Sequence, residues 1–214
     1  MDNFETLKNG LDQIGIDFSS GNLEMLELYI SEIELWNDKY KLVGTGGKDF
    51  IIRHVLDSLS AVPELKKHTF RTAADVGSGA GLPGIPLSIF FPDTKFTLIE
   101  RSGRRAGFLR NVLSLLNIMD RVFILEADLT EVKQTYDLVL FRAFRSLADY
   151  YSPLRKITAP GGSMFAYKGR IENIHAEIIN LRNSSNIDII PAFVPFLKEE
   201  RNFLIFTQLL QDIR

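Results

Sequence analysis

Five short runs of β-favouring residues alternate with stretches of helical periodicity through most of this 214-residue chain, and no other feature restricts the possible folds as strongly. The runs lie at about 71–76, 95–100, 121–126, 136–141 and 163–167. Strands that alternate with helices predict a doubly wound α/β fold, in which right-handed crossovers build a mostly parallel sheet. Two further runs, at about 187–194 and 202–208, have no helix between them, so we expect one of them to be antiparallel at the sheet edge.

The first 66 residues follow helical periodicity instead. Apolar residues at steps of three and four mark helices within 7–14, 23–36 and 50–59. Ser20 and Asn22 are capping candidates for the second helix, and Pro63 ends the third. We therefore expect a helical cap over 1–66 and a Rossmann-like domain over 67–214, packed as one compact unit.

Composition excludes several kinds of chemistry. The absence of cysteine rules out disulfides, thiolate metal sites and cysteine nucleophiles, and the three histidines are too scattered for a metal site. No apolar run is long enough for a membrane span and the polar start lacks a signal-peptide layout, so we expect a cytoplasmic location. A net charge of −2 gives no global attraction to nucleic acid, so such a partner would have to meet a local basic face.

A glycine-rich segment over 75–84 follows the first predicted strand, where glycines let the backbone approach a ligand closely. The spacing of Gly79, Gly81 and Gly84 matches the dinucleotide fingerprint, but that fingerprint places its first glycine directly after the strand. Here Asp75 and Gly77 come first. We expect Asp75 at a ligand crevice and not in the core, where its carboxylate would accept hydrogen bonds from an amino-acid ammonium and would repel a pyrophosphate. This favours the methionine moiety of S-adenosylmethionine.

Two more acids end neighbouring strands. Glu100 follows the second strand, where a carboxylate can accept both hydroxyls of a ribose, although this holds for either class of nucleotide cofactor. Asp128 follows the third strand, where it can accept a hydrogen bond from an adenine amino group or cap the next helix. Successive strand ends meet at one crevice, so the three acids predict an adenosine-binding site.

The segment 75–87, with prolines at 83 and 86, resembles that of the bacterial glucose-inhibited division protein B family, the 16S rRNA guanine-N7 methyltransferases. Further matches occur in the family's order from about residue 22 to the end, at Arg53-His54-Val-Leu-Asp57-Ser58, 103–105, 142–144, 167–169 and 200–202. The resemblance implies a class I methyltransferase fold with a seven-stranded sheet, S-adenosylmethionine as donor, and one guanosine in the 530 loop of 16S rRNA, naked or in the 30S particle, as acceptor. We expect no metal or membrane partner, and we expect a monomer.

The resemblance places the methyl donor on the glycine loop and the strand ends. Gly77, Leu82 and Arg142 match family cofactor-contact positions, and the adenine-contacting segment aligns with either 126–128 or 128–130. The full set of expected cofactor residues is Asp75, Gly77, Gly79, Gly81, Leu82, Glu100, Ala127, Asp128, Leu129, Thr130 and Arg142.

Guanine N7 carries a lone pair and no proton, so its methylation needs alignment but no general base. We expect Arg142 and Lys168 to act in the transfer step, with Arg142 orienting either the methionine carboxylate or a guanine acceptor, unless it is a surface ion pair. Phe141 or Phe144 can stack on the base, although both are more often core residues. A basic rim is expected to meet the RNA, formed by Arg53, His54, Arg101, Arg104, Arg105, Lys168 and Arg201.

Two other functional classes remain open at this point. A nucleotide-dependent oxidoreductase would bind NAD tightly and S-adenosylmethionine not at all. A non-catalytic rRNA assembly module would bind ribosomal RNA whether or not the cofactor is present.

Overall fold

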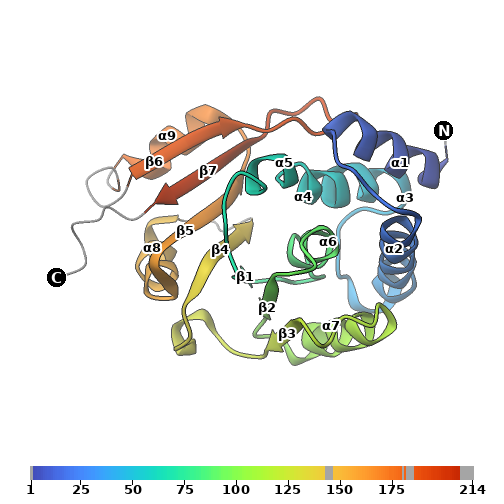
Figure 1. Ribbon diagram of the computed structural model, residues 1–214, viewed down its shortest axis with the longest axis horizontal. Helices are drawn as coiled ribbons and strands as arrows, with labels where there is room; N and C mark the ends of the chain where they lie inside the picture. The colour runs from blue at the N-terminus through green and yellow to red at the C-terminus, as the bar shows by residue number, and fades with distance from the viewer. Residues whose placement is uncertain (1, 143–146, 180, 182–185, 208–214) are drawn as a thin grey trace.

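The computed structural model describes residues 2–142, 147–179, 181 and 186–207 and contains one seven-stranded sheet with strand order β3-β2-β1-β4-β5-β7-β6 (Figure 1). The strands are β1 Thr72–Val76, β2 Lys95–Ile99, β3 Val122–Leu125, β4 Tyr136–Arg142, β5 Thr158–Lys168, β6 Asn186–Pro191 and β7 Asn202–Thr207. Strands β1 to β5 pair in parallel, which confirms the predicted class I methyltransferase architecture. The antiparallel strand is β7, but it lies between β5 and β6, so its predicted place at the sheet edge is wrong.

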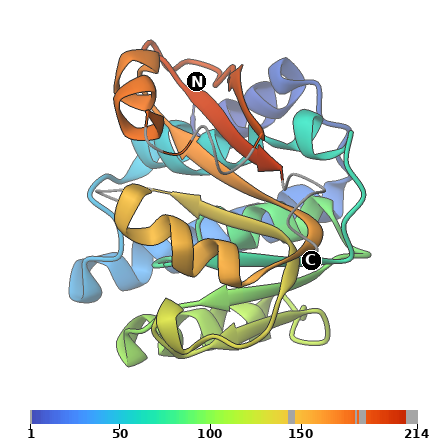
Figure 2. The same cartoon turned by 90° about the vertical axis from the view of Figure 1, so that its left-hand side faces the viewer.

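Helices cover both faces of the sheet (Figures 1 and 2). On one face lie α6 Gly84–Phe90 and α7 Gly103–Leu115, against which α2 packs; α8 Leu147–Lys156 and α9 Ile171–Ile178 lie on the other. The N-terminal segment forms α1 Asn3–Ile14, α2 Ser20–Tyr40, α3 Gly47–Phe50, the π-helix η1 Ile51–Leu56, α4 Asp57–Leu59 and α5 Val62–Leu65.

The predicted helical cap shares its core with the sheet. One hydrophobic cluster contains Leu26 of α2 together with Phe96 of β2 and Leu140 of β4, all three fully buried. Polar contacts join the same layers: Tyr29 donates its hydroxyl to the Ala80 carbonyl at 2.9 Å. The N-terminal helices and the sheet therefore share one hydrophobic core.

Local sequence explains where several elements begin and where the predictions missed. Ser19, and not Ser20, is the N-cap of α2, and Asn22 completes its capping box, because the Asn22 side chain reaches back to the Ser19 backbone. Pro63 lies in the first turn of α5, where backbone N–H groups have no partner within the helix, so the missing N–H of proline costs nothing there. Pro63 therefore does not end the helical run. Only the three-residue 3₁₀ helix η2, Leu129–Glu131, lies between β3 and β4, where the alternation predicted a helical stretch.

The C-terminal ends of the parallel strands meet at one edge of the sheet, as ligand sites of doubly wound folds require. Because β7 runs in the opposite direction, its first residue, Asn202, pairs with Lys168, the last residue of β5. The preceding residue, Arg201, therefore reaches the same edge as Arg142 at the end of β4. None of the helices in the described residues is long and apolar enough to span a membrane.

Candidate functional site

The glycine loop after β1 turns sharply at three glycines. Gly77, Gly79 and Gly81 have φ values of 71°, 59° and 91°, in the left-handed region that side chains disfavour. The amides of Gly77 and Ser78 bind the Ile99 carbonyl at 2.9 and 3.1 Å, which ties the loop to the end of β2. The loop thus exposes backbone, not side chains, at the strand ends.

Asp75 lies beneath this loop and not on its surface. It is 1% exposed, so the expectation that it stays out of the core is wrong. Its Oδ2 accepts a hydrogen bond from the Gly84 amide at 2.9 Å at the start of α6, while its Oδ1 has no hydrogen-bond partner within the described part of the chain. Burial raises the pKa of Asp75 to about 7, a rise opposed by the Gly84 hydrogen bond and the Arg142 charge. Asp75 Oδ1 is therefore a buried carboxylate oxygen that could accept a hydrogen bond from a ligand.

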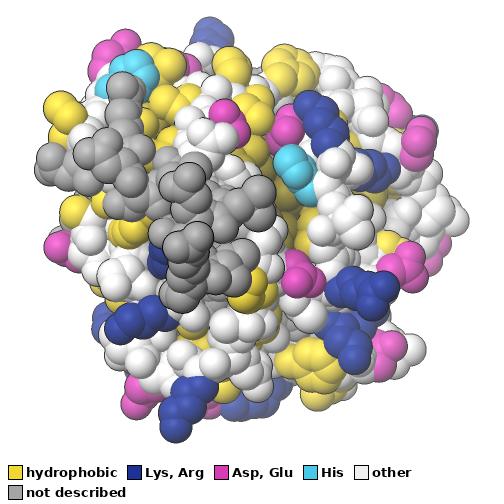
Figure 3. Space-filling model, turned by 60° about the vertical axis from the view of Figure 1, so that its left-hand side comes forward, with side chains coloured by type: hydrophobic (Ala, Val, Ile, Leu, Met, Phe, Trp, Pro, Cys, Tyr) yellow, Lys and Arg dark blue, Asp and Glu magenta, His cyan; other side chains and the backbone are white. Residues whose placement is uncertain are grey.

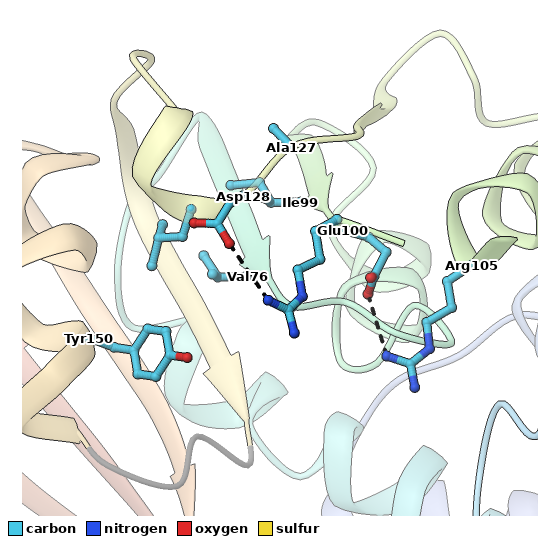
Figure 4. A pocket seen from close by; sticks show the side chains of 10 residues that line it. Val76, Ile99, Glu100, Arg105, Ala127, Asp128 and Tyr150 are labelled. Carbon is cyan, nitrogen blue, oxygen red and sulfur yellow. Dashed lines mark ion pairs between the residues drawn. The ribbon is translucent and has the colours of Figure 1, made fainter. Parts of the chain in front are cut away.

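A pocket opens beside the loop at the ends of β1, β2 and β3 (Figure 4). It is lined by Val76, Gly77, Ile99, Glu100, Arg101, Arg105, Ala127, Asp128, Leu129 and Tyr150. Its wall combines apolar side chains with the carboxylates of Glu100 and Asp128, which suits a flat ring joined to a hydroxylated sugar.

Glu100 is held firmly at the pocket. Its Oε2 accepts from the Gly79 amide at 2.9 Å and its Oε1 from the Ser102 amide at 2.8 Å, and the side chain is 4% exposed. Arg105 Nη1 lies 4.0 Å from Glu100 Oε2. The carboxylate is thus oriented by the loop and by the start of α7, as a ligand-binding group must be.

Asp128 caps the next helix, one of the two roles that its position allowed, and also lines the pocket. Its Oδ1 caps η2 by accepting from the amide and hydroxyl of Thr130 at 3.0 and 2.8 Å, and these bonds lower its pKa. Its Oδ2 lies 4.0 Å from Arg101. Ala127, Asp128 and Leu129 line the pocket whereas Thr130 does not, which favours neither of the two sequence alignments outright.

The structure thus gathers only part of the expected cofactor set. The residues that do not line the pocket are Asp75, Gly79, Gly81, Leu82, Thr130 and Arg142. Arg101 and Arg105, expected on the RNA rim, line it instead. Tyr150 of α8 adds an aromatic ring that sequence reasoning missed, because a tyrosine on an amphipathic helix carries no ligand signal.

A second group of polar side chains, the Asp57 cluster, consists of His54, Asp57, Arg142 and Arg201. Arg142 Nη1 lies 3.3 Å from Asp57 Oδ2, and Arg142 Nη2 lies 3.0 Å from His54 Nδ1. Arg201 Nε donates to the other carboxylate oxygen, Oδ1, at 3.0 Å. Asp57 is 4% exposed, so Arg142 is not the surface ion pair weighed against a functional role.

Most of the predicted basic rim is paired with acids. Arg53 lies 2.7 Å from Glu199, and Lys168, which is largely buried, bonds to Glu177 of α9. Figure 3 shows the consequence on one face, where Lys and Arg side chains are interspersed with Asp and Glu. Arg104, in the first turn of α7, is exposed and has no ion pair with any described residue.

The two candidate stacking aromatics have different outcomes. Phe141 is 1% exposed and belongs to the core between the sheet and α8, so the alternative that Phe141 is a core residue is confirmed. Phe144 lies outside the described residues.

A family model, GidB, described as rRNA small subunit methyltransferase G, matches residues 22–205. The chain is 38% identical over 198 residues to ribosomal RNA small subunit methyltransferase G of Borrelia hermsii, a match that covers 91% of this chain and 95% of that protein. The protein of the same name from Salmonella arizonae is 36% identical, with 91% and 93% covered.

Solved structures agree at the level of the fold. A SAM-dependent O-methyltransferase from Thermotoga maritima superposes with a TM-score of 0.54 at 14% identity, over 72% of this chain and 64% of that one. Likeness at such low identity shows the architecture alone.

Proposed function

We propose the function of this chain from the premise that it belongs to the GidB family, the rRNA small subunit methyltransferase G proteins. It is an rRNA methyltransferase, and we propose that it transfers the methyl group of S-adenosylmethionine to N7 of one guanosine in the 530 loop of 16S rRNA. Family membership sets aside the oxidoreductase alternative. A purely structural role in ribosome assembly is excluded by any assay that detects transfer.

The observation that carries the cofactor assignment is the unpaired Oδ1 of Asp75 beneath a loop of left-handed glycines. An orphaned buried carboxylate oxygen is costly unless a ligand donor reaches it, and the ammonium of an amino acid is such a donor. Gly79 adds room, because a Cβ built there would meet only the Gly77 carbonyl, at 3.8 Å. The residues present therefore fit the methionine end of the cofactor.

The remaining contacts follow from the pocket. We propose that Glu100 accepts the ribose hydroxyls, that Asp128 and the backbone at 127–129 meet the adenine edge, and that Tyr150 packs on the adenine ring. When bound, S-adenosylmethionine supplies an electrophilic methyl group on a sulfonium. Arg142 and Lys168 remain the proposed residues of the transfer step, placed at the ends of β4 and β5.

His54 of the Asp57 cluster is not poised to act as a general base. Arg142 has only donors, so His54 Nδ1 must be the acceptor in their contact and the ring proton sits on Nε2. Burial and the charges of Arg142, Arg53 and Arg201 lower the pKa of His54 to about 4. The lone pair of His54 is already used by Arg142, so His54 cannot take a proton from the substrate. This agrees with methylation of guanine N7, which has no proton to lose.

The test is tritiated methyl transfer from S-adenosylmethionine to naked 16S rRNA and to 30S particles from cells that lack the methylation. We expect label in one RNA fragment and, after complete digestion, in 7-methylguanosine alone. Label in a ribose, in an exocyclic amine or in protein would contradict the N7 assignment. RNA binding without any transfer would support the assembly role instead.

Arg104 is the cleanest test of the RNA-facing surface, because Arg105 lines the cofactor pocket and a change there affects both ligands. Arg104→Glu should weaken RNA binding and lower the salt slope of log K by roughly one to two, since a phosphate contact releases counterions. Affinity for S-adenosylmethionine should not change. Lys95→Glu is the matched control, because Lys95 is also exposed but begins β2, at the opposite end of the parallel strands. Equal salt slopes for wild type and Arg104→Glu would show that Arg104 is a solvated surface residue that does not contact the RNA.

A further inference from the structure

One buried carboxylate joins three parts of the chain at the functional edge of the sheet. Asp57 lies at the start of α4, and its two oxygens are shared between Arg142 at the end of β4 and Arg201 before β7. These partners are 85 and 144 positions away along the sequence. The side chains of Arg142 and Arg201 are 20% and 26% exposed, against 6% for Asp57, so both guanidiniums extend from a buried anchor toward the surface.

The backbone around Asp57 is held in place independently of the arginines. The π-helix η1 ends immediately before it, and π-helical turns occur frequently at functional sites. Tyr167 donates its hydroxyl to the Ser58 carbonyl at 2.8 Å, and Ser58 Oγ donates to the His54 carbonyl at 2.6 Å. The carboxylate therefore sits on a rigid support that reaches β5 through Tyr167.

Stability alone gives a poor account of this arrangement. Burial raises the pKa of Asp57, which shows the cost of removing its charge from water, and the two arginines oppose that rise. Buried ion pairs are often no more stabilising than apolar residues of equal volume. What the arrangement does provide is orientation: Asp57 and His54 each engage one terminal nitrogen of Arg142 and so set the plane of its guanidinium.

We propose that Asp57 is a positioning residue of the methyl-transfer site, which acts by holding Arg142, together with His54, and by holding Arg201. The proposal rests on the function proposed above, in which Arg142 contacts the methyl donor or the guanine. Only two of the five N–H groups of Arg142 are used by Asp57 and His54, so the same guanidinium keeps donors for a ligand. The shared carboxylate also leaves one net positive charge on the arginine pair, which suits an anionic or acceptor-rich ligand.

The test compares Asp57→Asn with Asp137→Asn. Asp137 is the matched control because it lies near the start of β4, at the opposite end of that strand from Arg142, and its Oδ2 accepts from the amides of Arg71 and Thr72 and from the Thr72 hydroxyl. Both variants should lower Tm. Only Asp57→Asn should weaken S-adenosylmethionine binding or slow single-turnover transfer, by about tenfold or more, the value of one charge-assisted hydrogen bond.

A double-mutant cycle then asks whether Asp57 acts through Arg142. In an Arg142→Lys background the further loss caused by Asp57→Asn should be much smaller than in the wild type. Full additivity, or wild-type affinity and rate in Asp57→Asn, would overturn the positioning role. If the wild type itself neither binds the cofactor nor transfers methyl groups, the proposed function fails first, and the two failures are thereby distinguished.

Should Asp57→Asn not fold, the second contact of Arg142 addresses the same question. His54→Gln keeps an acceptor for Arg142 Nη2, whereas His54→Leu removes it at similar volume. We expect transfer to be slowed in the leucine variant and largely kept in the glutamine variant. Equal rates in the two would overturn the proposal.

Discussion

Arg142→Lys should slow single-turnover methyl transfer by about a hundredfold, because small errors in the alignment of reacting groups cost that much. A lysine ammonium is a single point of charge, so it cannot meet Asp57 and His54 in the plane that the guanidinium occupies and still face a ligand. Rapid-quench measurement at saturating RNA and cofactor gives the rate, and a burst must show that chemistry limits the turnover. A loss of less than threefold would remove Arg142 from the transfer step.

The same assay has a defined pH dependence. In wild type and in Arg142→Lys the single-turnover rate should be nearly flat from about pH 6 to 8.5, since N7 has no proton to lose and the arginines stay charged. His54, with a pKa of about 4, remains neutral over this whole range. A steep rise with an apparent pKa near 7 at saturating cofactor would point to a general base and to an acceptor other than N7.

Asp75→Asn should reduce affinity for S-adenosylmethionine by about a hundredfold while leaving the fold intact. Asparagine keeps an acceptor for the Gly84 amide but loses the charge that Oδ1 offers to an ammonium. Alanine is the weaker choice, because it would leave the start of α6 without that acceptor. Calorimetric titration with the cofactor measures the loss, and unchanged affinity would contradict the assignment of Asp75.

The stability of the cofactor-free protein tests the same carboxylate from another direction. Its folded-state pKa, about 7, lies above the ordinary value of 3.8, so the folded state binds more protons between these values. The contribution of Asp75 is fully present below pH 4 and is lost as pH rises to about 7. Relative to wild type, Asp75→Asn should therefore gain stability as pH rises from 5 to 8, by roughly 3 kcal/mol, in denaturant titrations. A difference that does not change with pH would contradict this ionisation.

Cofactor binding should be linked to the same proton. An ammonium beside Oδ1 favours the ionised carboxylate, so binding below pH 7 should release a proton and wild-type affinity should rise as pH approaches 7. Calorimetry in buffers with different ionisation heats detects the release, which Asp75→Asn should lack.

The sequence predicted the strands of the sheet well, because each buried strand is a short run of β-favouring residues between breakers. The clear failure is β5, which begins at Thr158 and not near 163, because Gly161 and Gly162 lie in an irregular stretch that shifts its register against β4. Such a stretch has the composition of a turn, so local propensity cannot reveal that the strand continues on both sides of it.

The site was predicted only where it depends on a continuous segment. The glycine loop and Glu100 follow from residues adjacent to strand ends. The burial of Asp75 could have been inferred, since in a strand Asp75 shares a face with Ala73, two residues earlier, and that face meets the cap. The role of Asp57 could not, because nothing in the sequence indicates that residues 85 and 144 positions away converge on it.

The position of β7 between β5 and β6 bears on the order in which the molecule can be assembled during its own synthesis. Strand β5 pairs with β4, which precedes it in the chain, and with β7, which follows it. In a growing chain one edge of β5 therefore stays unpaired until residues 202–207 have been made. Arg201 immediately precedes that strand, and the anchor on Asp57 lacks its second arginine until then. We therefore expect chains that stop before residue 201 to hold the glycine loop and yet lack a competent site, so that methyl transfer can begin only after residues 201–207 have been made.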